Sequence, residues 1–352
     1  MYKLSIIVLS LIVLSSCSNE NTNYKPKSTG QLGSLIVVSS EEGIKNLGSL
    51  VDDIFLSPTL HLDNEPFFSV KKINAESFMK FFYNHKTVLV LVTKESTNEL
   101  YEVLESFSGE KIQKYLHDTS VNLVVKKDLL AYNQHVVFLF GETEADIKRK
   151  LNSKSNYIVN SLLNYEIIDE NKKLFSDTSS NDRFYNEIKK EFGVGVRIPK
   201  HFNLLKKEDG FYWFQMEAEE EDVQKIIGLT MHSYPYTDTS DFSYASIRTI
   251  RDSTLKYKIP GELPGTYMGT TESKFYPPIF KEIIELNGRY TSKIRGWWTI
   301  RGMTMAGPFV RYVVHVKETN KLFAFEGFVY KPNLNTKEKD LRMIEAIALS
   351  IK

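Results

Sequence analysis

The chain has 352 residues, of which 42% are hydrophobic and 25% are charged, and its formal net charge is +1. These fractions are usual for a globular protein. A near-neutral charge lacks the basic excess of nucleic-acid binders, so we expect no nucleic-acid partner. The length exceeds the roughly 250–300 residues at which a single hydrophobic core stops growing, so we expect two domains.

The first residues read MYKLSIIVLSLIVLSSC. A single positive side chain, Lys3, precedes an apolar run from Leu4 to Leu14. This run is too short to span a bilayer, which needs about 20 apolar residues. A charged start, an apolar middle and a small-residue end are typical of a secretory signal. The last four residues, 14–17, resemble the bacterial lipobox, at which lipoprotein signal peptidase cuts before the cysteine.

Cys17 is the only cysteine in the chain, so it has no disulfide partner within it. The lipobox resemblance implies that its sulfur carries a diacylglycerol, and several acyl chains on one residue anchor a protein stably. We therefore expect a signal peptide over 1–16, a flexible tether over 17–33 and a lipid-anchored protein of the cell envelope, at the outer membrane. The alternative is a chance cysteine after an ordinary signal or a short membrane segment.

Residues 34–192 are predicted to form an N-terminal α/β-type domain with a mixed sheet. Its strands are expected over 35–39, 67–73, 87–92, 120–132 and 134–141. The run Thr87–Val92 is apolar throughout, as in a strand covered on both faces. Ser40 and Asn74 are expected to cap helices between the strands, and Phe78, Phe81 and Phe82 are expected to share the apolar face of the second one.

Two helices are predicted to close this domain. Thr143 is expected to cap the first, whose apolar residues from Ile147 to Leu162 keep helical spacing. The second contains Ile188 and Phe192, and Gly193 stands where a glycine commonly stops a helix. We therefore place the domain boundary there.

Residues 193–352 are predicted to form an antiparallel sheet packed with helices, which makes the whole chain α+β. Hairpin turns are expected at Gly210 and at Asn287-Gly288, the strongest short hairpin signal in the chain. Ser240 or Asp241 is expected to cap a helix that ends near Tyr257. Asn335, with Glu338, is expected to cap the closing helix.

Several motifs in this half carry a family resemblance. They are FGVGVRIPKHF, HSYPYTD, IPGELPGTYM, YPPIF, NGRYTSKIRGWW, AGPFV and FEGFVYKP, and they follow an early LIVV strand. In this order they resemble the Bacteroidota lipoprotein family catalogued as domain-of-unknown-function family 4837, over nearly all of the mature chain. The resemblance implies a cell-envelope lipoprotein and no catalytic residues. The C-terminal half also resembles the PsbP-like sandwich, a fold-level analogy that says little about function.

No catalytic or cofactor motif is present. The chain lacks a G-x-S-x-G elbow, an H-E-x-x-H helix and a phosphate loop. Its seven histidines occur singly, at His61, His85, His117, His135, His201, His232 and His315. We therefore predict no catalytic residue, no cofactor and no metal ligand.

The stretch over 289–301 is predicted to be a strand with one charged face. Side chains alternate between the two faces of a strand, so that face is expected to carry Arg289, Lys293, Arg295, Trp297 and Arg301. The next strand places Arg311 and His315 together on one face as well. If the two faces coincide, arginine forks and an exposed Trp297 suit an anionic or glycan component of the envelope. The alternative is a solvated sheet face neutralised by acids such as Glu326.

These features favour a binding or structural role in the envelope over catalysis. The alternative function is an envelope hydrolase that acts on glycan, peptidoglycan or ester substrates. A pocket in which a histidine meets a nucleophile would favour the hydrolase. A shallow face with Trp297 exposed would favour binding, and an apolar patch of several hundred Å² would favour a periplasmic assembly partner.

Overall fold

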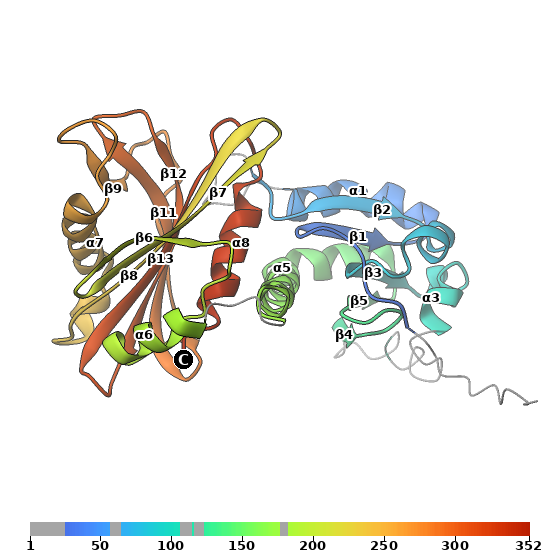
Figure 1. Cartoon of the computed structure of the whole chain (residues 1–352). Helices are drawn as coiled ribbons and strands as arrows, with labels where there is room; N and C mark the ends of the chain where they lie inside the picture. Colours follow the sequence, from blue (N-terminus) through green and yellow to red (C-terminus); the bar gives the residue numbers. More distant parts are fainter. Residues whose placement is uncertain (1–24, 57–64, 106–114, 116–122, 177–181) are drawn as a thin grey trace, which may run out of the picture.

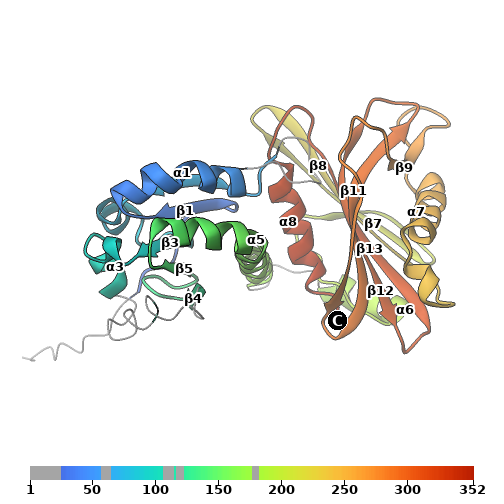
Figure 2. The same ribbon diagram turned by 180° about the vertical axis from the view of Figure 1, so that it is seen from behind.

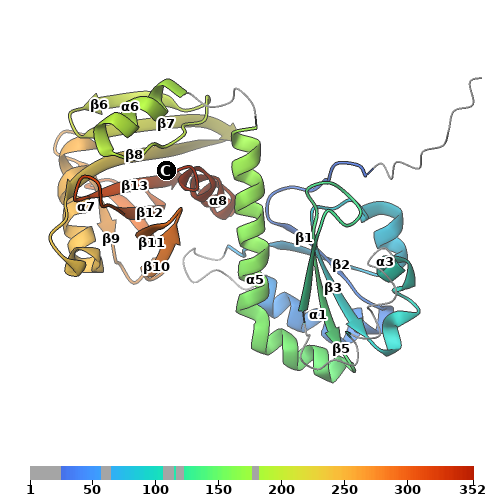
Figure 3. The same cartoon turned by 90° about the horizontal axis from the view of Figure 1, so that it is seen from below.

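The computed structural model describes residues 25–56, 65–105, 115, 123–176 and 182–352. It contains two β-sheets, one in the N-terminal half (residues up to 176) and one in the C-terminal half (residues from 182), with helix α5 between them (Figure 1, Figure 2 and Figure 3). The predicted α+β class is confirmed. The predicted signal peptide and Cys17 lie outside the described residues. No helix in the described ranges combines the length and apolarity needed to span a bilayer.

The N-terminal sheet has five strands in the order β2-β1-β3-β5-β4. They are β1 (Ser34–Val38), β2 (Ser69–Ile73), β3 (Thr87–Thr93), β4 (Leu123–Lys127) and β5 (His135–Gly141). Only β4 runs antiparallel to its neighbour, so the predicted mixed sheet is confirmed. Every residue of β3 and β5 is buried, as expected of central strands covered on both faces.

Helices cover both faces of this sheet. On one face lie α1 (Glu41–Phe55) and the 31-residue α5 (Glu144–Leu174). On the other lie α3 (Tyr101–Glu105) and a short helix, α2 (Ala75–Ser77), which continues as one π-helical turn (Phe78–Phe82). Phe81 was predicted on the apolar face but is 64% exposed, because the π turn changes the spacing from 3.6 residues.

Three predicted helix caps are confirmed. The side chains of Ser40, Asn74 and Thr143 each accept a backbone N–H of the first turn. The cap predicted at Ser240 or Asp241 is wrong: α7 (Tyr244–Lys258) begins after Ser243, whose hydroxyl accepts from Ser246 N–H. Asp241 belongs instead to the capping box of a short 3-10 turn (Thr239–Phe242).

The cap predicted at Asn335 is also wrong. α8 (Lys337–Ala348) begins after Thr336, which makes no side-chain cap. Its hydroxyl instead donates to Glu220 and accepts from Lys331. Tertiary contacts therefore replace the local cap.

The C-terminal sheet has eight antiparallel strands in the order β10-β11-β12-β13-β8-β7-β6, and β9 also pairs with β11. They are β6 (Asn203–Glu208), β7 (Phe211–Glu220), β8 (Val223–Pro235), β9 (Tyr267–Thr271), β10 (Phe280–Leu286), β11 (Arg289–Arg301), β12 (Ala306–Val316) and β13 (Lys321–Tyr330). The predicted turns at Gly210 and Asn287-Gly288 are confirmed, with φ of 70° at Gly210 and of 49° and 78° at the pair.

Helices cover this sheet on both faces as well. α7 packs on one face, against residues such as Trp298 and Val313. α6 (Asp182–Phe192) and α8 pack on the other, against residues such as Val310. The predicted helix end before Gly193 is confirmed, since Gly193 has a φ of 79°.

The two halves meet where α8 packs on α5. Asn171 of α5 donates to the carbonyl oxygen of Ala346 at 2.7 Å, and Arg342 of α8 pairs with Glu166 of α5. The described part of the predicted tether, residues 25–33, is bound to the N-terminal half; for example, Ser28 N–H donates to Tyr132 O at 2.8 Å. Residues 25–33 are therefore part of the folded N-terminal half.

Candidate functional site

The charged side chains predicted to form one face are divided between two faces. The register between β11 and β12 pairs Lys293 with Tyr312 and Ile294 with Arg311. Residues paired in this way point to the same side of a sheet. Lys293 and Arg295 therefore face α8, whereas Arg311 faces α7. The sorting within each strand was right, but the condition that the two faces coincide is not met.

The remaining residues of the predicted face do not form a platform either. Trp297 was expected to be exposed but is only 7% exposed, with its ring stacked on Tyr276 at 4.8 Å. Arg289 pairs with Glu318 at 2.9 Å. Arg301 is exposed and donates to Thr270 O, and His315 lies against the ring of Tyr236 at 4.3 Å. These contacts are structural ones.

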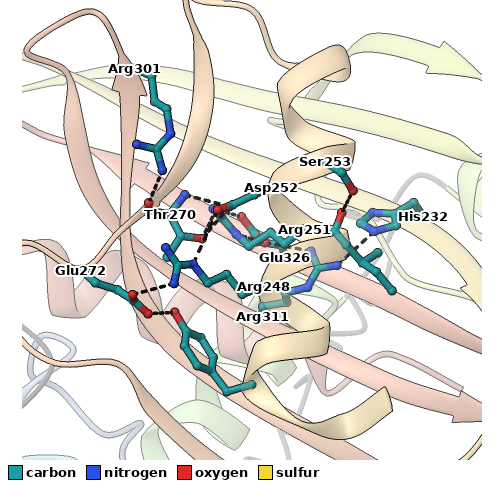
Figure 4. A network of polar contacts seen from close by, with 12 residues as sticks. His232, Arg248, Arg251, Asp252, Ser253, Thr270, Glu272, Arg301, Arg311 and Glu326 are labelled. Carbon is teal, nitrogen blue, oxygen red and sulfur yellow. Dashed lines mark hydrogen bonds and ion pairs between the residues drawn. The ribbon is translucent and has the colours of Figure 1, made fainter. Parts of the chain in front are cut away.

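A buried charge network lies between α7 and the C-terminal sheet (Figure 4). Arg251 of α7 donates two hydrogen bonds to Glu326 of β13, at 2.7 and 2.9 Å. Arg311 donates to the same carboxylate at 2.9 Å and meets His232 Nε2 at 3.0 Å. Burial and the two guanidinium charges hold the pKa of His232 well below its ordinary value, so this ring is neutral and accepts from Arg311.

This network, the α7 network, extends to the surface on one side. Arg251 also contacts Thr270 and Asp252, and next to them Arg248 pairs with the half-exposed Glu272 at 2.6 Å. Figure 4 shows these groups pointing toward one another from α7, β9 and the sheet. Because Arg251, Arg311 and Glu326 are each at most 1% exposed, the network holds α7 to the sheet and leaves no arginine fork for a ligand.

A second buried network, the α5–α8 network, joins the two halves. Glu166 of α5 pairs with Arg342 and also accepts from the Gly33 N–H at 3.0 Å. Arg295 of β11 pairs with Glu338 and Glu345 of α8, at 3.0 and 2.9 Å, and Glu338 also lies 3.6 Å from Arg342. Burial raises the pKa of Glu345, but the charges of Arg295 and Lys293 outweigh it and hold this pKa at about 2. All these carboxylates have a cationic partner.

A cleft of about 490 Å³ opens beside this network, between α5 and β10. Apolar side chains such as Ile167 and Ile284 line its walls, and Lys293 and Arg295 lie on its floor. Lys293 is paired with Glu282 at 3.2 Å and with Glu345 at 2.8 Å. An anionic ligand would have to displace these carboxylates, so the cleft does not provide the predicted anion site.

A second pocket, of about 520 Å³, lies between α5 and the β4–β5 hairpin. We call it the α5 pocket. The hairpin contributes Lys127, Asp128, Asn133 and His135, and α5 contributes Tyr157, Asn160, Ser161, Asn164, Tyr165 and Lys172. The helical residues recur every three or four positions and so share one side of the helix.

The floor of the α5 pocket holds a stacked pair of rings. His135 is 4% exposed and lies 4.3 Å from Tyr165, with an interplanar angle of 13°. His135 Nε2 is 3.4 Å from Ser161 Oγ. His135 Nδ1 and Tyr165 OH are enclosed and make no hydrogen bond within the described part of the chain. The pocket floor therefore has hydrogen-bonding capacity that the protein itself does not use.

Both floor groups are uncharged near neutral pH. Burial, assisted by the Lys127 charge, lowers the pKa of His135 to about 4. Burial, with the carboxylates of Asp169 and Asp128 nearby, raises the pKa of Tyr165. The pair thus offers neutral donors and acceptors to whatever occupies the pocket.

The contact between Ser161 and His135 does not form a nucleophile–base pair. In the described ranges no carboxylate contacts His135 Nδ1 to orient the ring, and a pKa of about 4 makes this imidazole a weak base near neutral pH. The described residues contain no group of three or more His, Cys, Asp or Glu side chains that could hold a metal ion.

This site could not be predicted from the sequence, because His135 stands alone along the chain. The signal that was available is the polar stripe on α5. Asn160, Asn164 and Lys172 lie beside the apolar stripe and recur at helical spacing. A stripe of this kind on a helix that also buries an apolar side is more often solvated than functional.

The depressed pKa of His135 predicts a pH dependence of stability. Because the unfolded chain binds this proton more readily, stability is lost as the pH falls from 6.5 toward about 4. His85 and His232 have lowered pKa values too and act in the same direction. We expect His135→Gln to lose less stability than the parent protein between pH 7 and about pH 4.5, measured by urea denaturation. An equal loss in both proteins would contradict this expectation.

Comparisons with known proteins find two families of unknown function. Residues 181–350 match the family model described as Domain of unknown function (DUF4837). Residues 28–175 match a different one, Domain of unknown function (DUF8532). The resemblance to family 4837 is thus confirmed for the C-terminal part, but it does not extend over nearly all of the mature chain as predicted. No curated protein matches this chain.

Several solved structures resemble part of the chain, two of them of protein Mog1. The Ran-binding protein Mog1p of Saccharomyces cerevisiae has a TM-score of 0.28 and 7% identity, over 46% of this chain and 91% of that chain. A mutant of protein Mog1 has a TM-score of 0.26 and 8% identity, over 45% of this chain and 84% of that chain. Similarity at this level carries no functional argument.

Proposed function

We propose that this protein is a lipid-anchored lipoprotein of the Bacteroidota cell envelope, at the outer membrane, that binds a small ligand in the α5 pocket. The lipobox-like residues 14–17 and the single cysteine support the anchor. The observation that carries the binding role is the pocket floor, where His135 Nδ1 and Tyr165 OH are enclosed without a partner in the described ranges.

Physical arguments support occupation of this pocket. An enclosed polar group without a partner costs about 1–3 kcal/mol, which a ligand that supplies the missing hydrogen bonds would recover. The pocket volume of about 520 Å³ falls within the range of roughly 300–1,000 Å³ typical of small-molecule sites. The cleft beside β10 has a similar size, but its floor cations are already paired.

Replacing the single cysteine tests the anchor. We expect Cys17→Ala to abolish incorporation of a labelled fatty acid and to leave the precursor uncleaved, because the diacylglycerol acceptor is missing. The measurement is fatty-acid labelling in cells, with immunoblotting of membrane and soluble fractions. Ser18→Ala, one residue further on, should be labelled and processed normally. Normal labelling of the cysteine variant would refute the anchor.

Blocking the pocket tests the binding role. The low-mass fraction of an envelope extract should raise the melting temperature of the purified full-length lipoprotein, since a ligand at about 100 times its Kd stabilises the folded state by ~2.7 kcal/mol. The variant Ser161→Leu should lose this shift, because this side chain lines the α5 pocket and not the cleft beside β10.

The matched control is Ser153→Leu, which changes an exposed serine of α5 outside both the pocket and the cleft. This variant should keep the full shift in melting temperature. Absence of a shift in the parent protein, or an equal shift in the pocket variant, would count against the proposed function.

A further inference from the structure

The rim of the α5 pocket carries an excess of positive charge. Lys127, at the end of β4, and Lys172, in the last turns of α5, both line the pocket. Neither makes an ion pair within the described ranges. Asp128 is the single carboxylate of the lining, and it accepts the Asn133 N–H at 2.6 Å. The pocket therefore has a net positive charge available to a ligand, unlike the cleft beside β10.

Lysine can bind a negatively charged group of a ligand without a fixed geometry. An ammonium group is a compact point charge on a flexible stem, so two of them can approach one carboxylate or phosphate from different sides. Both lysines are exposed, so their attraction is screened by salt, with a Debye length of about 10 Å at 0.1 M. A charged ligand should therefore bind more weakly as the ionic strength rises.

The rest of the lining matches hydroxyl groups. Asn133, Asn160 and Asn164 present side-chain amides, each of which both donates and accepts hydrogen bonds. Ser161 and the neutral floor pair of His135 and Tyr165 add further donors and acceptors. A sugar hydroxyl also both donates and accepts, so a ring with several hydroxyls can satisfy these groups together.

The pocket also has a surface for the apolar face of a ring. Tyr157 is 63% exposed and Ile168 is 47% exposed, and both line the pocket. An exposed tyrosine ring packs against the C–H face of a sugar while its hydroxyl stays in water. A simple inorganic anion would use the two lysines but would leave the amides, the floor and these apolar side chains without contacts.

We infer that the ligand of the α5 pocket is a small sugar with one negatively charged group, a carboxylate or a phosphate. This inference rests on the proposed function. Lys127 and Lys172 bind the charged group, the three asparagines bind hydroxyls at the rim, and the hydroxyl that reaches the floor bonds to His135 and Tyr165. Tyr157 covers the exposed face of the ring.

Isothermal titration of the full-length lipoprotein in detergent tests the ligand class. The probes are glucuronate, galacturonate, glucose 6-phosphate and galactose 6-phosphate, with neutral glucose and galactose for comparison. At low ionic strength we expect at least one acidic probe to bind at least about tenfold more tightly than its neutral counterpart, and this advantage should shrink in high salt. Comparing the affinities for the two uronates with those for the two sugar phosphates shows whether the charged group is a carboxylate or a phosphate.

Two double variants test whether the two lysines bind the charged group of the ligand. Lys127→Ala/Lys172→Ala should reduce the affinity for the acidic probe to that for the neutral sugar, while Lys148→Ala/Lys154→Ala, on α5 outside the pocket, should change nothing. Equal affinity for neutral and acidic sugars, or an unaffected lysine variant, would overturn the inference.

The outcomes separate this inference from the proposed function. If no sugar binds but the envelope extract still stabilises the protein and Ser161→Leu still loses this effect, the ligand class is wrong and the pocket function stands. If the extract has no effect either, both proposals are overturned.

Discussion

Replacing Glu326 with alanine is expected to lower the free energy of unfolding by about 3–5 kcal/mol. This carboxylate is 0% exposed and accepts hydrogen bonds from both Arg251 and Arg311. Without it, two guanidinium groups remain buried side by side with no shared counter-ion. The loss is measured by urea denaturation followed by tryptophan fluorescence, because Trp298 packs on the same side of the sheet as the α7 network.

The control lies in the same region. Glu272→Ala removes a carboxylate whose side chain is 39% exposed and which pairs with Arg248. Exposed pairs contribute less than about 1 kcal/mol, since water solvates the partners well after the pair is broken. Equal effects of Glu326→Ala and Glu272→Ala would show that the α7 network does not stabilise the sheet as its burial indicates.

The second large effect is expected at the contact between the two halves. Glu166→Gln should also cost about 3–5 kcal/mol, because it leaves Arg342 buried without its main counter-charge. Glu166 further holds Gly33 and Thr87 of the N-terminal half. Weakening this contact should separate the unfolding of the halves, which calorimetry would record as two transitions in place of one.

Glu187→Gln provides the matched control. Glu187 lies on α6 and pairs with Arg183, whose side chain is 80% exposed, so the same chemical change there should leave the melting profile unchanged. A single transition with unchanged midpoint in Glu166→Gln would contradict the role assigned to the α5–α8 network.

Both networks explain why the predicted basic face is absent. Arg295 and Arg311 each carry the planar fork that suits a ligand carboxylate, but each meets a carboxylate of the protein itself: Glu338 and Glu326. A buried arginine must be paired, since an isolated charge in the interior is strongly unfavourable. The arginine–carboxylate pairing that suggested ligand binding therefore occurs within the protein, where it holds helices to the sheet.

The local features of the fold were predictable from the sequence. The apolar run of β3 predicted a strand covered on both faces, and the spacing from Ile147 to Leu162 predicted the buried side of α5. Asn287-Gly288 predicted its turn, because left-handed backbone is most accessible to these two residues. In each case the signal comes from residues close together in the chain.

The α5 pocket was not predictable in the same way. Its floor combines His135 from β5 with Ser161 and Tyr165 from α5, and its rim combines Lys127 from β4 with Lys172 from α5. The residue periodicity within one helix or strand does not indicate which other helix or strand it will lie against. The histidine was visible in the sequence, but its burial and neutral state result from the packing of α5 on the sheet.

Most strands, most helices and turns, and the way each strand divides its side chains between two faces could be predicted from the sequence alone. These follow from backbone geometry, which repeats every two residues in a strand and every 3.6 in a helix. Three features needed the three-dimensional structure: the register that separates Lys293 from Arg311, the pairing of the arginines, and the contact of α5 with the β4–β5 hairpin. These features depend on contacts between residues far apart in the chain. The free energies of such contacts cannot be inferred from the pattern of residues within one helix or strand.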